Sequence, residues 1–237
     1  MNRLSNPAIL AQLGVALFGL GMLLLHVLPS PMLYSTTSQL IPYDWHLNFI
    51  SEYSRTQYGP LMTFNFFMLS LASFAASAAM RRCALLREAN FLALAGISLF
   101  LLAVFPSDLT DLRVDGPNCA DATRVEPCTL SGRIHNPSSV VGFGAVALVW
   151  LSLAWRRKRE MKEVVKAGVH CFALLLLLVG CCFLYASHMP DFHRYWFGMI
   201  QRSIVFVCLL WLWFLFGRAS QLLAETQSSG FASQSAG

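Results

Sequence analysis

Six apolar stretches without a single Asp, Glu, Lys or Arg divide this chain, and they constrain its fold more than any other feature. They cover residues 8–28, 61–80, 91–105, 140–155, 167–187 and 203–217. An apolar helix of about 20 residues crosses the hydrocarbon core of a bilayer, since each residue adds about 1.5 Å to its length. Hydrophobic residues make up 56% of the chain and charged residues 12%, whereas soluble domains are about 25% charged. The sequence therefore predicts an integral membrane protein.

Proline and glycine residues set the predicted ends of the helices, because proline suits a first helical turn and interrupts a helix interior. Pro29 ends the first span, Gly59 and Pro60 begin the second, Pro106 ends the third, and Pro137 begins the fourth. We expect spans at 8–28, 61–80, 89–105, 137–155, 167–187 and 195–216. The predicted fold is an all-α bundle of six transmembrane helices over residues 1–218, followed by a disordered cytoplasmic tail at 219–237.

Basic residues predict the orientation of the bundle. They cluster at 81–87 and 156–166, and Arg3 and Arg218 flank the first and last spans. All four segments fall on one side of a six-span protein, and loops rich in Lys and Arg normally face the cytoplasm. We therefore expect a multi-pass protein of the bacterial inner membrane with both termini in the cytoplasm.

Two function classes are disfavoured by the same pattern. The basic loop at 156–166 directly links two spans, which fits an anchor on anionic lipid heads better than a nucleic-acid site. Proton-coupled transporters and ion pumps need ionisable groups near the middle of the membrane, and the six stretches contain no acidic residue, lysine or arginine. We expect membrane lipids as partners, with a second membrane protein as an alternative, and no nucleic acid.

The longest polar interval, 105–139, predicts where a site lies. Asp108 follows the third span and His135 opens the fourth, so both fall on the outer side of the membrane. Interfacial helix ends often carry histidine for reasons unrelated to function, and Asp108 could simply accept backbone N–H groups in a turn or helix cap. The remaining polar candidates on this side are Ser51, Glu52, His188, His193, Gln201 and Arg202.

Arg202 lies about one turn inside the sixth span, where a cation is costly unless it has a partner. Asp108, Glu52 and a lipid phosphate are the candidate partners. We predict that Asp108, His135 and Arg202 form one buried polar cluster. With Gln201, these residues make up the predicted binding site.

Several short motifs resemble a known family. They are the Phe-Pro-Ser-Asp sequence at 105–108, His135 at the start of the fourth span, Gly198-x-x-Gln201-Arg202, and the segment 47–52. Together they resemble the bacterial six-span proteins catalogued as domain of unknown function 998, over about residues 8–217. That family is similar in layout to the Frag/DRAM/Sfk-type membrane proteins. The resemblance implies an architecture and no activity.

A metal site is a second interpretation of the outer residues. Asp108, His135, His188 and His193 offer the carboxylate and imidazole ligands that suit a divalent ion such as Zn²⁺, and an open position would hold an activated water. Ser51 or Glu52 could then orient that water or stabilise an oxyanion. Such a site is similar to that of membrane hydrolases of the alkaline-ceramidase type. It departs from them because His188 and His193 are five residues apart rather than four.

Cys119 and Cys128 are the only two cysteines of the long outer loop. In an oxidising periplasm we expect them to form a disulfide, because zinc binding would need two further ligands nearby. Two functions of different class follow from the sequence. One is a non-catalytic membrane protein that binds lipid or a protein partner at its outer face, and the other is a metal-dependent hydrolase acting on a lipid or amide at the outer leaflet.

Overall fold

The computed structural model describes residues 6–29, 32–34, 40–45, 48–108, 129–156, 161–187 and 197–234. Within this part of the chain, six helices are long and apolar enough to cross a membrane. They are α1 (Pro7–Val27), α2 (Gly59–Arg82), α3 (Leu86–Val104), α4 (Leu130–Arg156), α5 (Lys162–Ser187) and α6 (Phe197–Gln234). The protein is therefore an all-α integral membrane protein with six spans, as the sequence predicted.

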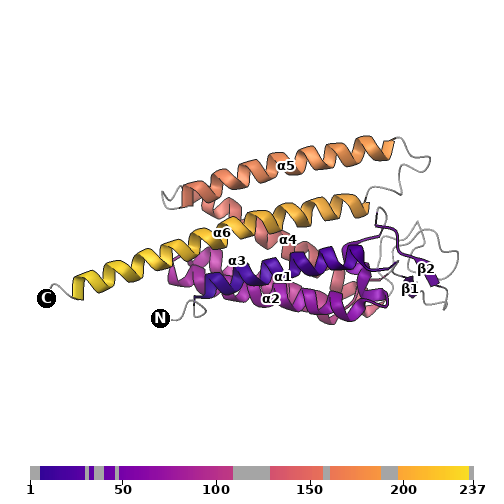
Figure 1. Ribbon diagram of the computed structural model, residues 1–237, viewed down its shortest axis with the longest axis horizontal. Coiled ribbons are helices and arrows are strands. Elements are labelled where there is room, and N and C mark those ends of the chain that lie inside the picture. Colours follow the sequence, from indigo (N-terminus) through magenta and orange to yellow (C-terminus); the bar gives the residue numbers. More distant parts are fainter. Residues whose placement is uncertain are drawn as a thin grey trace.

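Two small elements between α1 and α2 were not predicted. Strands β1 (Met32–Tyr34) and β2 (Leu40–Pro42) pair antiparallel, with Leu33 opposite Ile41, and the 3₁₀ helix η2 (Ile50–Arg55) follows them. Figure 1 shows both strands at one end of the bundle, opposite the end at which the N- and C-termini lie. We call this end of the molecule the hairpin end.

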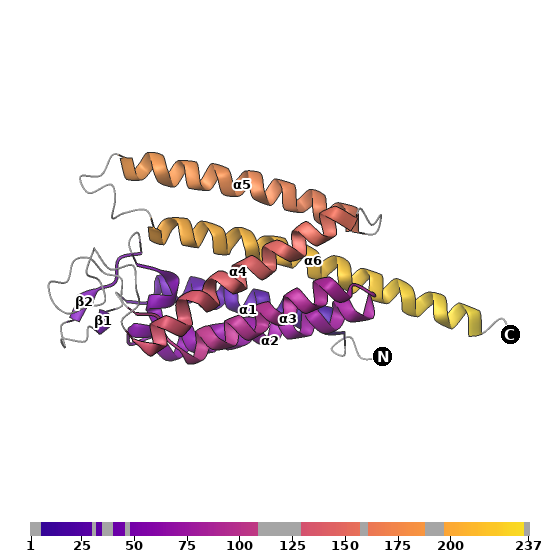
Figure 2. The same cartoon turned by 180° about the vertical axis from the view of Figure 1, so that it is seen from behind.

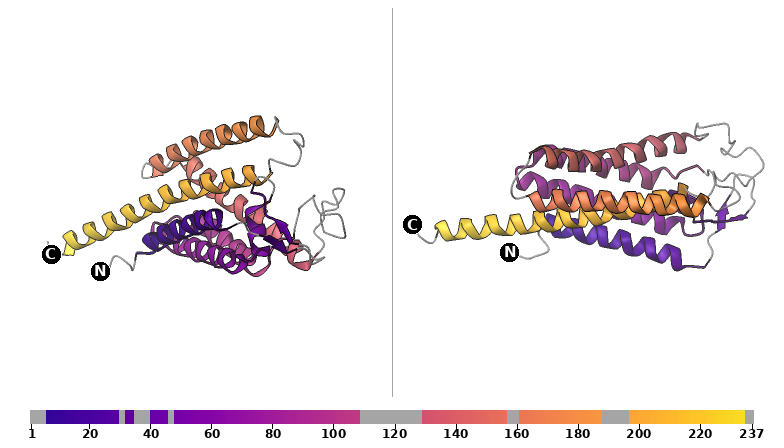
Figure 3. Two further views of the ribbon diagram at one scale, coloured as in Figure 1. Left: turned by 45° about the vertical axis from the view of Figure 1, so that its right-hand side comes forward. Right: turned by 90° about the horizontal axis from the view of Figure 1, so that it is seen from above.

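The helices form a bundle with a loosely attached outer member. Helix α2 packs between α1 and α3, α4 packs on α3, and α6 packs on α1. Helix α5 packs mainly on α6 and is the least buried of the six, so it lies at the side of the bundle (Figures 2 and 3). The apolar core lies between α1, α2, α3 and α6, where Leu25, Met62, Met80 and Leu215 are fully buried.

Small residues allow α1, α2 and α3 to approach one another closely, as is common where helices associate in membranes. A Cβ atom added to Gly14 on α1 would lie 2.5 Å from the Cβ of Ala72 on α2. The Ser70 hydroxyl on α2 donates to the carbonyl oxygen of Gly96 on α3 at 2.8 Å. These contacts fix the three helices against which the candidate site is built.

Two helices, α4 and α6, extend furthest beyond their predicted limits. Helix α4 begins at Leu130, so Pro137 lies inside it instead of at its first turn. Helix α6 continues to Gln234, so residues 220–234 are helical where we expected a disordered tail. The Arg218 guanidinium donates to Gln221 at 3.0 Å and to Glu225 at 3.4 Å, which supports helix beyond the predicted span end.

Candidate functional site

Three side chains join the start of α4 to the end of α3: Thr129, which precedes α4, and Ser131 and His135 in its first turns. His135 Nδ1 donates to the Phe105 carbonyl oxygen at 2.7 Å. The Ser131 hydroxyl donates to the Pro106 carbonyl oxygen at 2.6 Å. The first residues of the Phe-Pro-Ser-Asp motif therefore offer their carbonyl groups to α4, and these bonds bring His135 beside the end of α3.

Asp108 completes this joint by holding the start of α4. Its carboxylate accepts from the Thr129 hydroxyl at 2.5 Å and from the Thr129 backbone N–H at 3.1 Å. The Thr129 oxygen in turn accepts from the backbone N–H of Gly132 at 3.0 Å, which satisfies one of the free donors of a helix N-terminus. The Arg55 guanidinium of η2 lies 3.7 Å from the same carboxylate. The capping role that we considered for Asp108 is therefore present, although the helix it caps is α4.

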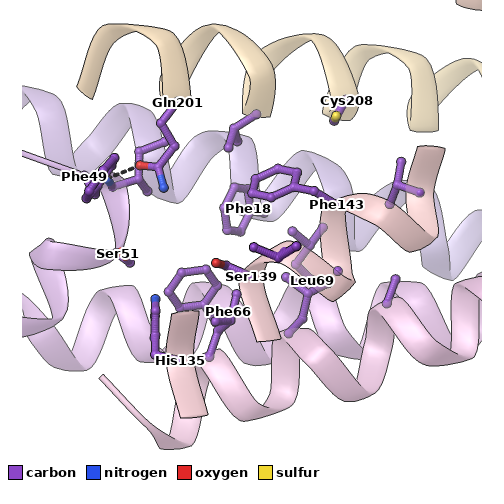
Figure 4. Close-up of a pocket in the computed structure, with 18 of the residues that line it drawn as sticks. Phe18, Phe49, Ser51, Phe66, Leu69, His135, Ser139, Phe143, Gln201 and Cys208 are labelled. Atoms are coloured by element: carbon purple, nitrogen blue, oxygen red, sulfur yellow. Dashed lines mark hydrogen bonds between the residues drawn. The ribbon is translucent and has the colours of Figure 1, made fainter. Parts of the chain in front are cut away.

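A cavity of about 370 Å³ opens beside this joint, a volume in the range of small-molecule sites in proteins. Side chains of α1, η2, α2, α3, α4 and α6 line it, as Figure 4 shows for Phe18, Phe66, His135, Phe143 and Gln201. Most of its polar lining groups lie at the hairpin end: Ser51, Ser107, Asp108, His135, Asn136, Ser139 and Gln201. Ser73 lies deeper, in the middle of α2, and its hydroxyl donates to the Leu69 carbonyl oxygen of the same helix at 2.9 Å. The rest of the lining is almost entirely apolar.

The cavity follows the helices for about half of a membrane. On α6 its lining runs from Gln201 to Leu212, and on α4 from His135 to Val146. Either distance corresponds to about 16 Å along a helix, whereas the hydrocarbon core of a bilayer is about 30 Å thick. The cavity therefore has a polar mouth near one membrane boundary and an apolar interior that reaches toward the middle.

Two polar atoms at the mouth can form hydrogen bonds beyond those they make with the described residues. The Ser107 hydroxyl is buried and has no partner among the described residues. Because the Phe105 carbonyl oxygen can only accept, His135 Nδ1 carries the proton, and the neutral ring then has an acceptor at Nε2. An unmet hydroxyl that is buried in protein costs about 1–3 kcal/mol, so it points to a ligand or water at this position.

The residues just before α2 cover the mouth of the cavity. Phe49, Ile50 and Ser51 line it, and the Ile50 backbone N–H donates to Gln201 Oε1 of α6 at 2.6 Å (Figure 4). Glu52 is fully buried and accepts from Asn48 Nδ2 at 2.7 Å and from the Phe49 backbone N–H at 3.1 Å. Glu52 therefore organises the start of η2, while Ser51 faces the cavity.

Arg202 belongs to a second cluster, beside the cavity. Its guanidinium donates to His26 Nε2 at 3.1 Å and to the carbonyl oxygens of Asn48 and Gly198 at 2.9 Å each. It also donates to the Tyr43 hydroxyl. Burial raises the pKa of the Tyr43 phenol, which stays protonated and donates to the Phe49 carbonyl oxygen at 3.0 Å.

The predicted cluster of Asp108, His135 and Arg202 is therefore wrong in its third member. Asp108 and His135 lie together at the cavity, but Arg55 is the arginine that pairs with Asp108. Arg202 pairs with neither carboxylate that we considered, since neutral oxygens and a histidine nitrogen take its donors. Gln201 lines the cavity but Arg202 does not, because these two adjacent residues point to different sides of α6.

The remaining sequence predictions fall partly outside the described residues. Among those that the structure describes, no three His, Cys, Asp or Glu side chains group closely enough to hold a metal ion. The predicted ligands His188 and His193, and the predicted disulfide partners Cys119 and Cys128, lie outside the described ranges. The zinc site and the disulfide stay predictions.

Sequence reasoning missed five polar residues of the site: Ser107, Asn136 and Ser139 of the cavity lining, and Arg55 and Thr129 beside Asp108. Ser107 stands inside the motif that we singled out, but a serine after proline also fits a plain turn. Arg55 and Thr129 reach Asp108 only because η2 and the start of α4 fold beside it. Their one sequence signal is nearness to a span boundary, which many polar residues share.

Comparison with known protein families gives a match. The family described as Protein of unknown function (DUF998) matches residues 38–217, which include every described lining residue of the cavity except Phe18. No curated protein and no solved structure shows a significant match to the chain.

Proposed function

This chain belongs to the DUF998 family of proteins of unknown function, and we propose that it binds a single lipid-like amphiphile in the cavity. The observation that carries this proposal is the polarity gradient of the cavity lining. Polar groups surround the mouth, and apolar side chains of α2, α3, α4 and α6 surround the interior. An amphiphile has the same division between head and chain.

The size and depth of the cavity fit this ligand class. A volume of about 370 Å³ is too large to be a packing defect in a protein interior, where voids rarely exceed one water molecule. A depth of about 16 Å allows an extended hydrocarbon chain to follow α6 from Gln201 to Leu212. Burial of that chain away from water would supply most of the binding free energy, at about 0.8 kcal/mol per methylene group.

The test compares a blocked cavity with an unblocked one. Val205 lines the cavity, whereas Val169 on α5 is exposed on the outside of the bundle. We expect Val205→Trp to weaken binding of 1-oleoylglycerol to the purified, delipidated full chain by at least about tenfold, measured by native mass spectrometry in detergent. Val169→Trp should bind like the unsubstituted protein. Equal binding by both variants and the unsubstituted protein would show that the amphiphile sits on the surface, and the proposal would be wrong.

We also propose that the cavity mouth faces the outside of the bacterial inner membrane and that both termini are cytoplasmic. The support is the basic loop at 156–166 and the arginines at 81–87, which the positive-inside rule assigns to the cytoplasm. A reporter fused after Lys158 should read as cytoplasmic and one fused at Asp121 as periplasmic. The opposite pair of signals would reverse the orientation and place the mouth at the inner leaflet.

A further inference from the structure

The polar groups at the cavity mouth also indicate which head group it accepts. We infer that the bound amphiphile has an uncharged, hydroxyl-bearing head group and that anionic lipids are rejected. This inference rests on the proposed function and adds the chemical class of the ligand.

The first observation is the charge of the lining. Asp108 is the one formally charged side chain among the described residues that line the cavity, and no described lysine or arginine lines it. Proteins that bind phosphate or carboxylate head groups normally supply cationic or multiple backbone donors. A second anion beside Asp108 would instead meet a like charge in a region of low dielectric constant.

The two arginines near the mouth do not change this conclusion. Arg55 is not a lining residue, and its Nε donates to the Ser107 carbonyl oxygen at 2.8 Å while its Nη2 pairs with Asp108. Arg202 is also absent from the lining, and its Nε, Nη1 and Nη2 atoms donate four of its five hydrogens to protein acceptors. Both guanidinium groups therefore make protein contacts beside the mouth, and neither belongs to the described lining of the cavity.

The second observation is that two polar atoms at the mouth can form further hydrogen bonds. His135 Nε2 is an acceptor, and the buried Ser107 hydroxyl, which has no partner among the described residues, can donate or accept. Both side chains line the mouth. A ligand hydroxyl can donate to the first and accept from the second. A phosphate monoester is mostly a dianion at neutral pH, so its oxygens act mainly as acceptors and seldom offer a proton to Nε2. The free acceptor therefore favours an alcohol over an anion.

The test uses two ligands that differ only in a phosphate group. We expect 1-oleoylglycerol to bind the full chain at least about tenfold more tightly than 1-oleoylglycerol 3-phosphate, measured by native mass spectrometry at pH 7.5 and constant ionic strength. Oleylamine, which carries the same chain and a cation, should not exceed 1-oleoylglycerol. If neither glycerol ligand binds, the proposed function fails with the inference. If the phosphate ligand binds equally or better, or if oleylamine binds best, the inference alone is wrong.

Two substitutions assign the selectivity to the named groups. Asp108→Asn removes the charge at constant size and should reduce the preference over the phosphate ligand severalfold. His135→Asn keeps a donor for the Phe105 carbonyl oxygen but removes the Nε2 acceptor, so it should weaken binding of 1-oleoylglycerol and leave methyl oleate, which has no hydroxyl, unchanged. Unaltered selectivity in both folded variants would overturn the assignment. The ligand comparison on the unsubstituted protein decides the inference even if a variant does not fold.

Discussion

Arg202 illustrates how a single residue can join distant parts of this membrane protein. It lies on α6, and its guanidinium contacts His26 of α1, the Tyr43 hydroxyl and the Asn48 carbonyl oxygen. Arginine suits this role because its planar group presents five donors in fixed directions, whereas lysine presents a compact point charge. The residue holds the segment before η2 against α6, and this segment covers the cavity.

We expect Arg202→Lys to lower the thermal unfolding midpoint of the purified protein. Lysine cannot reach His26, Tyr43 and Asn48 at the same time, and hydrogen bonds to a charged group contribute about 1.5–3 kcal/mol each. Circular dichroism in detergent measures the change. Arg218→Lys is the matched control on the same helix, since the Arg218 guanidinium donates to Gln221 and Glu225, which lie within two turns of it on α6. Equal midpoints for the two variants would contradict the conclusion that Arg202 holds the segment before η2 against α6.

At the scale of elements, the joint between α3 and α4 depends on a close approach at Gly132. A Cβ atom added there would lie 2.1 Å from Asp108 Oδ2, closer than any real contact allows. The carboxylate can therefore reach Thr129 only because residue 132 has no side chain. The joint is the reason that α4 starts at Leu130 and that His135 reaches the cavity.

Gly132→Ala should therefore destabilise the protein by about 1–3 kcal/mol, the usual cost of forcing an extra carbon into a packed site. Gly144→Ala on the same helix is the control, because a Cβ atom at Gly144 meets nothing within 4 Å. That substitution should be neutral or stabilising by up to about 1 kcal/mol, since alanine favours helix over glycine. Denaturant or thermal unfolding of both variants checks the difference. A Gly132→Ala protein as stable as Gly144→Ala would show that the Asp108 cap is dispensable.

The sequence predicted the elements better than the contacts between them. Charge-free apolar stretches are sufficient to find six spans, because a bilayer requires long apolar helices. The start of α4 was misplaced at Pro137 because proline is common in a first helical turn, whereas the cap formed by Thr129 and Asp108 allows seven more residues to be helical. The predicted depth of Asp108, His135 and Arg202 in the membrane placed all three residues at one boundary. This depth does not determine the direction in which a side chain points around its helix. Adjacent Gln201 and Arg202 face different partners for that reason.

For the whole molecule, the cavity lies between two groups of helices that are joined unevenly. Helices α2, α3 and α4 pack in series, and α6 with α5 attaches mainly through α1. The cavity lining comes from both groups, with His135 and Phe143 on α4 and Val205 and Leu209 on α6. An amphiphile in the cavity would therefore fill space between α4 and α6 and contact both groups at once.

Occupancy should consequently stabilise the molecule in a defined region. At a free concentration of 100 times the dissociation constant, a ligand that binds only the folded state adds about 2.7 kcal/mol to its stability. With 1-oleoylglycerol we expect slower amide hydrogen exchange in η2, whose Ile50 N–H bonds to Gln201, and in α6 from Gln201 to Leu212. Exchange in α5, which supplies no described lining residue, should change little. The Val205→Trp protein should show no ligand-dependent protection. Protection spread evenly over all six helices, or protection that persists in that variant, would mean that the amphiphile coats the outer surface of the helices non-specifically and does not occupy the cavity.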